Sequence, residues 1–155
     1  MSTTPASDTG NAGQRHPDVL AVCRYWEEKR GDRMMPSRAD IDPLELKRYL
    51  PGIILIDVVA DRRRYVYRLV GTREVAMRGK DPTGQSMIDG FFGPNLAEAL
   101  SIPDRVVAMR SPFFLARSFV APDGRLGDEE LVMLPLSDDG ETVNKILGYT
   151  HHRLA

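Results

Sequence analysis

The stretch that most constrains the fold is residues 68–86, which read RLVGTREVAMRGKDPTGQS. Its first residues suit the end of a β-strand, and Gly71-Thr72 then interrupts the strand. Thr72 can cap a short helix that Gly79 ends, and a Gly- and Pro-containing loop follows. The stretch therefore predicts a strand, a short helix and a loop that together close a pocket over a sheet. It supplies no obvious catalytic group.

Length and composition favour one globular domain. A chain of 155 residues is long enough for one core and short for two. Hydrophobic residues make up 42% and charged residues 28%, as is typical of globular proteins. The net charge of −1 gives no basic excess for a nucleic-acid or anionic membrane partner. Because no apolar run can span a bilayer and no signal peptide is evident, we expect a cytoplasmic protein without a membrane span.

The N-terminal part predicts a tail followed by a helix. Residues 1–15 hold almost nothing to bury, so we expect a flexible tail, with a single domain over residues 16–155. The domain should open on a helix from Pro17 that Gly31 ends. The sole cysteine, Cys23, excludes an intrachain disulfide and should be a buried small hydrophobe rather than a nucleophile. The apolar side chains of this helix are Val19, Val22, Cys23 and Trp26.

Two β-rich runs then predict a hairpin. A short helix over residues 42–49 should precede strands at residues 53–59 and 64–70. If Val59 pairs with Arg64, one face of the hairpin is the core face. The other face is too apolar for water, so the N-terminal helix or a second copy of the chain should cover it. The core face would carry Ile54, Ile56, Val58, Tyr65, Tyr67 and Leu69.

Short helices and three more strands should complete the domain. Ser86 and Asp89 resemble a capping box for one helical turn. Pro94 should open a longer helix, which Pro103 should kink or split. The order of elements favours an antiparallel α+β sheet with its helices gathered on one face. The three remaining strands are expected at residues 113–120, 129–136 and 143–150.

Several segments carry a family resemblance. They are Tyr25-Trp26, residues 36–43 (PSRADIDP), Leu50-Pro51, residues 67–72 (YRLVGT), Thr83-Gly84 and residues 134–137 (LPLS). With the order of strands, they resemble a PAS domain, in the bacterial subclass in which one such domain makes up most of the protein. The resemblance implies a five-stranded antiparallel sheet with short helices on one face. It places the N-terminal helix on the other face or at a dimer interface.

The resemblance also implies a sensory or interaction module whose concave sheet face holds a small molecule beneath the middle helices. Photoreceptor members place a flavin-reactive cysteine in those helices, but Cys23 precedes the sheet. Haem-binding members use a histidine there, whereas His16, His151 and His152 lie near the two ends of the domain. Neither cofactor matches, and the cofactor stays unassigned. We expect His151 and His152 to belong to a frayed C-terminus rather than to a metal site.

Methionine and aromatic side chains are the candidate ligand contacts. Adaptable methionines and flat aromatic walls suit a small apolar ligand, and ordinary core packing is the alternative. The tyrosine hydroxyls could bind the ligand or a partner within the protein. Outside this set, Arg68 should form an ion pair with Asp57 on the outer face. The candidate ligand residues are Tyr65, Tyr67, Met77, Met87, Phe91, Phe92, Met109 and Phe113.

The leading interpretation is a cytoplasmic PAS-type sensory or interaction module without chemistry of its own. It would bind a small ligand, a protein partner or both, and would pass its output to a signalling protein in trans. We also expect a homodimer, with Val19, Val22 and Trp26 at the interface.

Two alternatives stay open. A small pocket enzyme that isomerises or dehydrates apolar substrates would need an acid or a histidine with a shifted pKa inside the pocket. Asp57 should face outward and Asp81 lies in a loop, so no catalytic residue is assigned. The second alternative is a structural adaptor with a filled core and no ligand.

Overall fold

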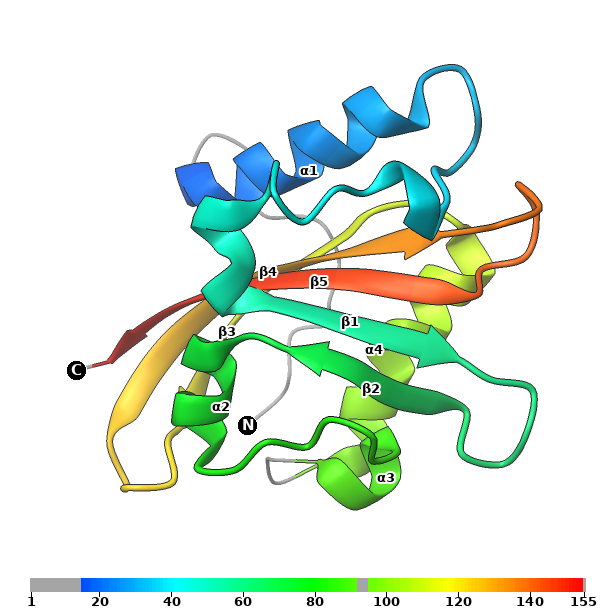
Figure 1. The fold of residues 1–155 in the computed structure, drawn as a ribbon. Coiled ribbons are helices and arrows are strands. Elements are labelled where there is room, and N and C mark those ends of the chain that lie inside the picture. The colour runs from blue at the N-terminus through cyan, green and yellow to red at the C-terminus, as the bar shows by residue number, and fades with distance from the viewer. Residues whose placement is uncertain (1–14, 92–94, 155) are drawn as a thin grey trace.

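A computed structural model describes residues 15–91 and 95–154, which build a five-stranded antiparallel sheet with helices on both sides (Figure 1). The strand order is β2-β1-β5-β4-β3, so the last strand of the chain lies in the middle of the sheet. This is the predicted α+β class. The strands are β1 (Ile53–Val58), β2 (Tyr65–Val70), β3 (Phe113–Val120), β4 (Leu126–Leu136) and β5 (Lys145–Leu154).

Three helices begin or end at residues that the sequence marked as helix boundaries. Gly31 follows the first helix, and Gly79 ends the second in a left-handed conformation with φ of 80°. The Ser86 side chain accepts a hydrogen bond from the amide of Asp89 and caps the third. The expected tail and the helix start at Pro94 fall outside the described residues. The helices are α1 (Pro17–Arg30), α2 (Thr72–Arg78), α3 (Met87–Gly90), α4 (Leu96–Met109) and the 3₁₀ helices η2 (Arg38–Asp40) and η3 (Lys47–Gly52).

The β1–β2 hairpin follows the expected register only near its turn. Ile56 lies opposite Tyr67, as predicted. A β-bulge then shifts the pairing, so that Ile54 faces Val70 instead of Leu69. Leu69 was expected on the core face but is 43% exposed. The alternation of apolar residues gave no sign of this extra residue.

One face of the sheet, here called the inner face, is turned toward α2, α3 and α4. Residues that pair across neighbouring strands share a face, which assigns the inner side chains through the register. Ile102 and Val106 of α4 and Met87 of α3 are buried in the same core. The buried inner-face side chains include Ile54, Ile56, Tyr65, Tyr67, Phe113, Leu131 and Ile146.

The other face, here called the outer face, is covered by α1, which packs on β4 and β5 along the top of Figure 1. The indole nitrogen of Trp26 donates a hydrogen bond of 2.8 Å to the carbonyl oxygen of Pro135. Val19, Val22 and Trp26 are 2% exposed or less. They belong to the chain's own core, and a dimer interface at these residues stays a prediction. The expectation that the helix covers the outer face is confirmed.

Three other expectations need correction. Residues 42–49 form turns with successive i to i+3 hydrogen bonds that lead into η3, because the segment is short and Pro51 follows. Helix α4 continues through Pro103, so of the two expected outcomes, a kink or a split, the split is wrong. Strand β5 extends to Leu154, so His151 and His152 belong to the sheet and not to a frayed end.

In the part of the chain that the structure describes, no helix is both long and apolar enough to cross a membrane.

Candidate functional site

The candidate site is the interior between the inner face and helices α2, α3 and α4. The structure brings four of the predicted ligand residues together there: Tyr65, Tyr67, Met87 and Phe113 are each 5% exposed or less and share one core. Two come from β2, one from α3 and one from β3. The interior is therefore walled by aromatic and methionine side chains, as the sequence suggested.

The other predicted ligand residues lie differently. Met77 and Phe91 are only partly buried, and Phe92 lies outside the described residues. Met109 is 60% exposed at the end of α4 and faces solvent. It is thus not a wall of this interior, because the last turn of α4 carries it to the surface.

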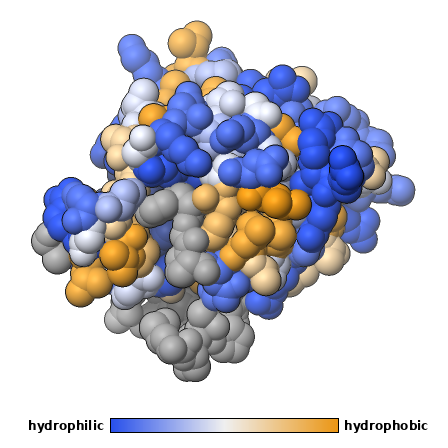
Figure 2. Space-filling model, turned by 90° about the horizontal axis from the view of Figure 1, so that it is seen from below, coloured by the Kyte–Doolittle hydropathy of each residue, from blue (hydrophilic) through white to orange (hydrophobic). Residues whose placement is uncertain are grey.

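The roof of the interior is thin at α3. Viewed from below, the molecule shows apolar side chains gathered on part of this face among polar ones (Figure 2). Met87 is buried, whereas the next residue, Ile88, is 42% exposed. One short helical turn therefore separates the core from solvent at this place.

Tyr65 ends in a polar contact at the surface side of the interior. Its hydroxyl donates a hydrogen bond to Asp104 on α4, which also binds the guanidinium of Arg64. Burial, together with the nearby Asp104 carboxylate, raises the pKa of Tyr65. Although burial alone would raise the pKa of Asp104, hydrogen bonds from Arg64 and Tyr65 hold it below its usual value. The Asp104 side chain is 45% exposed, so it is an ionised surface partner rather than an enclosed base.

Tyr67 has a cationic partner instead. Arg78, in the last turn of α2, donates a hydrogen bond of 3.3 Å from Nη1 to the Tyr67 hydroxyl. Its guanidinium also lies 5.1 Å from the centre of the Tyr67 ring. The buried Nε of Arg78 has no hydrogen-bond partner among the described residues. A buried donor of this kind is available to a bound acceptor.

A buried acid and a histidine meet beneath α2. Glu74 Oε2 and His152 Nδ1 lie 3.1 Å apart, and their side chains are only 5% and 7% exposed. Neither atom has a hydrogen bond of good geometry within the described part of the chain. Each such buried group costs about 1–3 kcal/mol unless something satisfies it. The pair therefore places a buried polar contact at the α2 end of the interior.

More polar groups surround this pair on the inner face. Glu129 of β4 is the register partner of His152, and its side chain is 10% exposed. Arg117 of β3 lies 3.4 Å from a Glu129 oxygen. The ring of Phe119 is 5.3 Å from the ring of His152. We call Glu74, His152, Glu129 and Arg117 the polar pole of the interior.

Helix α2 is fixed over the polar pole by Arg73. Its Nη2 donates hydrogen bonds to the Thr150 carbonyl at 2.6 Å and to the Tyr149 hydroxyl at 3.2 Å, both on β5. Gly52 makes room for this guanidinium, because a Cβ there would clash with Arg73 Nη2 and would also lie 2.8 Å from the Thr150 oxygen. The next residue along α2 is Glu74, which is thereby held over β5.

Sequence patterns did not predict the polar pole. Glu74 lies in the first turn of a short helix, where an acid is ordinarily a solvated partner of the helix dipole. His152 lies near the end of the chain, where adjacent histidines suggested a frayed strand. The predicted ion pair of Arg68 and Asp57 is present at 2.9 Å, with Lys145 as a second partner of Asp57 at 2.6 Å.

The fold is a five-stranded antiparallel sheet with short helices on one side and an N-terminal helix on the other. The chain belongs to the PAS domain family, whose model matches residues 14–151. Members of this family are sensory modules that bind ligands or partners. None of the curated proteins matches the sequence significantly.

Solved structures of low sequence identity share the fold. One, from work on a flavin analogue and the mechanism of a light-oxygen-voltage (LOV) domain, is 14% identical with a TM-score of 0.54, over 71% of this chain and 82% of that one. The light state of the blue-light photoreceptor Aureochrome1 LOV is 11% identical with a TM-score of 0.50, over 69% and 84%. VqmA bound to DPO is 15% identical with a TM-score of 0.54, over 71% and 56%.

The residues of this chain do not fit a flavin that reacts with a cysteine. Cys23, its sole cysteine, lies in α1 and is packed against the outer face. The sheet therefore separates it from the interior beneath α2, α3 and α4. Burial raises the pKa of the Cys23 thiol to about 11, which keeps it protonated and unreactive at neutral pH.

Proposed function

We propose that this PAS domain senses a small molecule held between the inner face and helices α2, α3 and α4. The observation that carries the proposal is the buried pair of Glu74 and His152, whose facing atoms lack a well-formed hydrogen bond. Small-molecule sites combine apolar walls with a few convergent polar groups. Here the walls are Tyr65, Tyr67 and Met87.

The proposed ligand has an apolar body and one polar end. The body packs on the aromatic and methionine walls, and the polar end reaches the polar pole. A hydrogen-bond donor on the ligand satisfies Glu74, and an acceptor satisfies Arg78. The module acts in the cytoplasm, has no chemistry of its own and passes its output to a partner protein. A homodimer interface at Val19, Val22 and Trp26 stays a prediction, although these side chains are buried in the single chain.

Glu74→Gln tests the ligand site, because it keeps the shape of the side chain and removes its charge. The protein is purified from cells under native conditions, and any retained molecule is identified by comparing native and denatured mass spectra. We expect wild type to retain a small molecule and Glu74→Gln to retain about tenfold less, which corresponds to about 1.4 kcal/mol.

Glu141→Gln, at an exposed position after the β4 strand, is the matched control and should retain as much as wild type. A wild-type protein whose native and denatured masses agree would contradict the proposal. Equal retention by Glu74→Gln and wild type would remove Glu74 from the site.

A second candidate function follows from the same pair. A buried carboxylate beside an imidazole supplies the two kinds of side chain from which a small pocket enzyme could draw a general base. The two candidates predict opposite results for Glu74→Gln. A sensor loses its ligand, whereas an enzyme without its base keeps the substrate bound and no longer converts it. Mass analysis of the retained molecule in wild type and variant separates them.

A further inference from the structure

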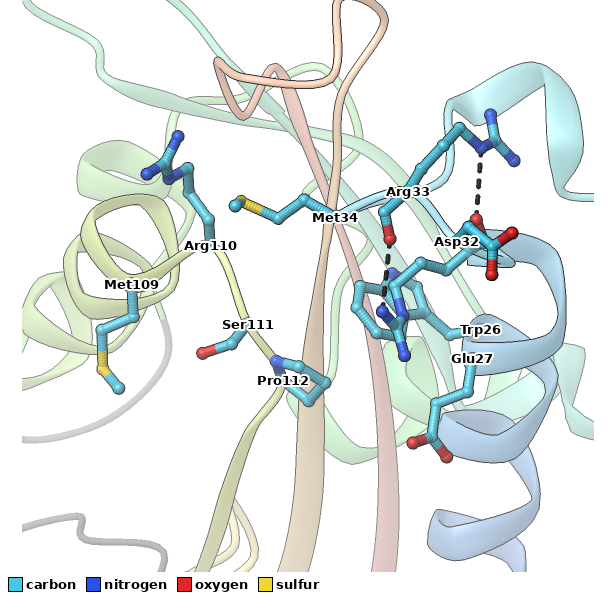
Figure 3. A pocket seen from close by; sticks show the side chains of 10 residues that line it. Trp26, Glu27, Asp32, Arg33, Met34, Met109, Arg110, Ser111 and Pro112 are labelled. Atoms are coloured by element: carbon cyan, nitrogen blue, oxygen red, sulfur yellow. Dashed lines mark hydrogen bonds between the residues drawn. The ribbon is translucent and has the colours of Figure 1, made fainter.

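A hollow of about 560 Å³ lies on the surface between the end of α1 and the end of α4, away from the ligand interior (Figure 3). One wall is built by α1 and the loop after it, and the other by the α4 end and its connection to β3. The residues that matter here are Arg30 and Met34 on the first wall and Met109, Arg110 and Pro112 on the second.

Two exposed methionines flank the hollow. Met34 is 49% exposed and Met109 is 60% exposed, and in Figure 3 the Met34 side chain extends toward Arg110 across the hollow. Methionine is adaptable and recurs at surfaces that bind peptides. Methionine and arginine are also enriched where proteins meet, whereas lysine is depleted, and among the described residues no lysine lines this hollow. The composition therefore fits a protein segment.

The charges of the hollow are divided between its walls. On the α1 side, Arg33 pairs with Asp40 at 2.9 Å. Arg30 donates from Nη1 to the Arg33 carbonyl at 3.2 Å, and its buried Nε has no hydrogen-bond partner among the described residues. Glu27 and Asp32 add carboxylates to that wall. On the α4 side, the exposed Arg110 side chain has no hydrogen bond or ion pair to another described residue. An acidic group is thus accepted on the α4 wall and disfavoured on the α1 wall.

Arg110 also occupies an unusual backbone position. It follows the last residue of α4 with φ of 55°, a left-handed conformation that glycine adopts at the lowest cost. An arginine pays a steric cost in this conformation, which the helix dipole at this end partly offsets. Such a strained position is a pointer to function.

The two walls belong to different layers of the fold. Trp26 lies at the edge of the hollow. It attaches α1 to the outer side of the sheet through its hydrogen bond to the backbone carbonyl of Pro135. Helix α4 instead packs on the ligand interior through Ile102 and Val106, which are 4% and 0% exposed. A displacement of α4 by a bound ligand would therefore move Met109 and Arg110 relative to Met34. The hollow therefore lies where a movement of α4 would change the distance between its two walls.

We infer that this hollow docks a partner segment in which an apolar side chain is followed or preceded by Asp or Glu. The apolar side chain fits between Met34 and Met109, and the carboxylate binds Arg110. This inference rests on the proposed function, because it names the surface through which the sensor would reach its partner.

Selection from a random-peptide phage library on the full chain tests the docking surface. We expect the selected peptides to share an apolar residue beside an acidic one. A synthetic peptide of the commonest selected sequence is then titrated by fluorescence anisotropy. Arg110→Glu should weaken its binding about tenfold or more, because it places like charges together. The double variant Met34→Ser and Met109→Ser should weaken it by a similar factor.

The controls are matched substitutions at other exposed sites. Arg62→Glu reverses a charge at the β1–β2 turn, and Leu44→Ser removes an apolar side chain that is 80% exposed. Both should leave binding within about twofold of wild type. Peptides without an acidic residue, or binding that Arg110→Glu leaves unchanged, would overturn the inference. So would a dimer in sedimentation that Arg110→Glu dissociates, because the occupant would then be a second copy.

The two proposals fail separately. Mass spectrometry of a retained small molecule tests the ligand site in the interior, and peptide titration tests the docking site in the hollow. A protein that retains a ligand but selects no such peptide keeps its sensory site and loses this surface. A protein that binds the peptide without any retained molecule keeps the surface and loses the ligand site.

Discussion

At the scale of single residues, Gly71 joins β2 to α2 at a point with no room for a side chain. A Cβ there would lie 2.6 Å from the carbonyl carbon of Pro51 and closer still to the backbone oxygens of Leu50 and Pro51. These are backbone atoms, so they cannot move aside as a side chain can. The Gly71 amide also donates to the Ile53 carbonyl at 2.7 Å. This glycine therefore sets where α2, and with it Glu74, lies over the sheet.

Gly71→Ala should lower the free energy of unfolding by about 1–3 kcal/mol, since the added methyl forces the backbone apart. The matched control is Gly148→Ala in β5, where the nearest atom to the new Cβ would be 3.6 Å away. The control should change the free energy by less than about 0.5 kcal/mol. Urea unfolding followed by Trp26 fluorescence measures both. Similar losses in the two variants would show that the crowding at Gly71 is not what matters.

At the scale of elements, α1 is fastened to the sheet by both packing and one hydrogen bond. Trp26 is 2% exposed and its indole nitrogen donates to the Pro135 carbonyl. The neighbouring Tyr25 instead reaches an exposed contact, donating to Glu45 at 2.8 Å. The two adjacent aromatic residues thus both attach α1 to the rest of the chain, Trp26 in the core and Tyr25 at the surface.

Trp26→Phe should cost about 2–4 kcal/mol, because it leaves a buried carbonyl without its donor and opens a small cavity. Tyr25→Phe removes two exposed hydroxyl contacts, one donated to Glu45 and one accepted from the Asp42 amide, and should cost about 1 kcal/mol or less. Urea midpoints followed by circular dichroism compare the two. A larger loss for Tyr25→Phe would contradict the assignment of the buried hydrogen bond as the main fastening of α1.

Elements with local signals could be predicted from the sequence, and contacts between distant segments could not. Gly31 and Gly79 marked helix ends correctly, and the hairpin turn was placed within a residue. The bulge that exposes Leu69 depends on how β2 meets β1, which alternation does not encode. Glu74 and His152 were missed for the same reason, since their pairing joins positions that only the sheet brings together. The burial of Tyr65, Tyr67 and Phe113 follows strand periodicity and could be predicted, whereas their contact with a ligand stays a prediction.

At the scale of the whole molecule, one core joins the N-terminal helix, the sheet and α4. Buried residues of α1, such as Cys23, belong to the same cluster as Val106 of α4 and Ile146 of β5. A core without internal boundaries favours cooperative unfolding. The described part of the chain should therefore open as one unit rather than helix by helix.

Labelling of Cys23 with a thiol reagent tests this cooperativity. The thiol is buried with its pKa raised to about 11, so it reacts only when the chain opens. Because the folded pKa is raised, the protonated thiol contributes stability that is fully present below the unfolded pKa and is lost as pH rises toward 11. Labelling is therefore done at pH 7–8, where this contribution is constant. The free energy from labelling should equal that from urea unfolding. A clearly smaller value would mean that α1 leaves the sheet on its own.

The central position of β5 has a consequence for how the chain comes together during synthesis. Strands β2 and β1 form one ribbon and β4 and β3 form another, and only β5 joins them. A ribosome that has released residues up to 144 has therefore exposed two hairpins with open edges and nothing between them. The sheet closes only when the last-made strand enters the gap, which makes assembly a late, long-range step. Until then, the two open edges expose unpaired backbone groups that can pair with other chains.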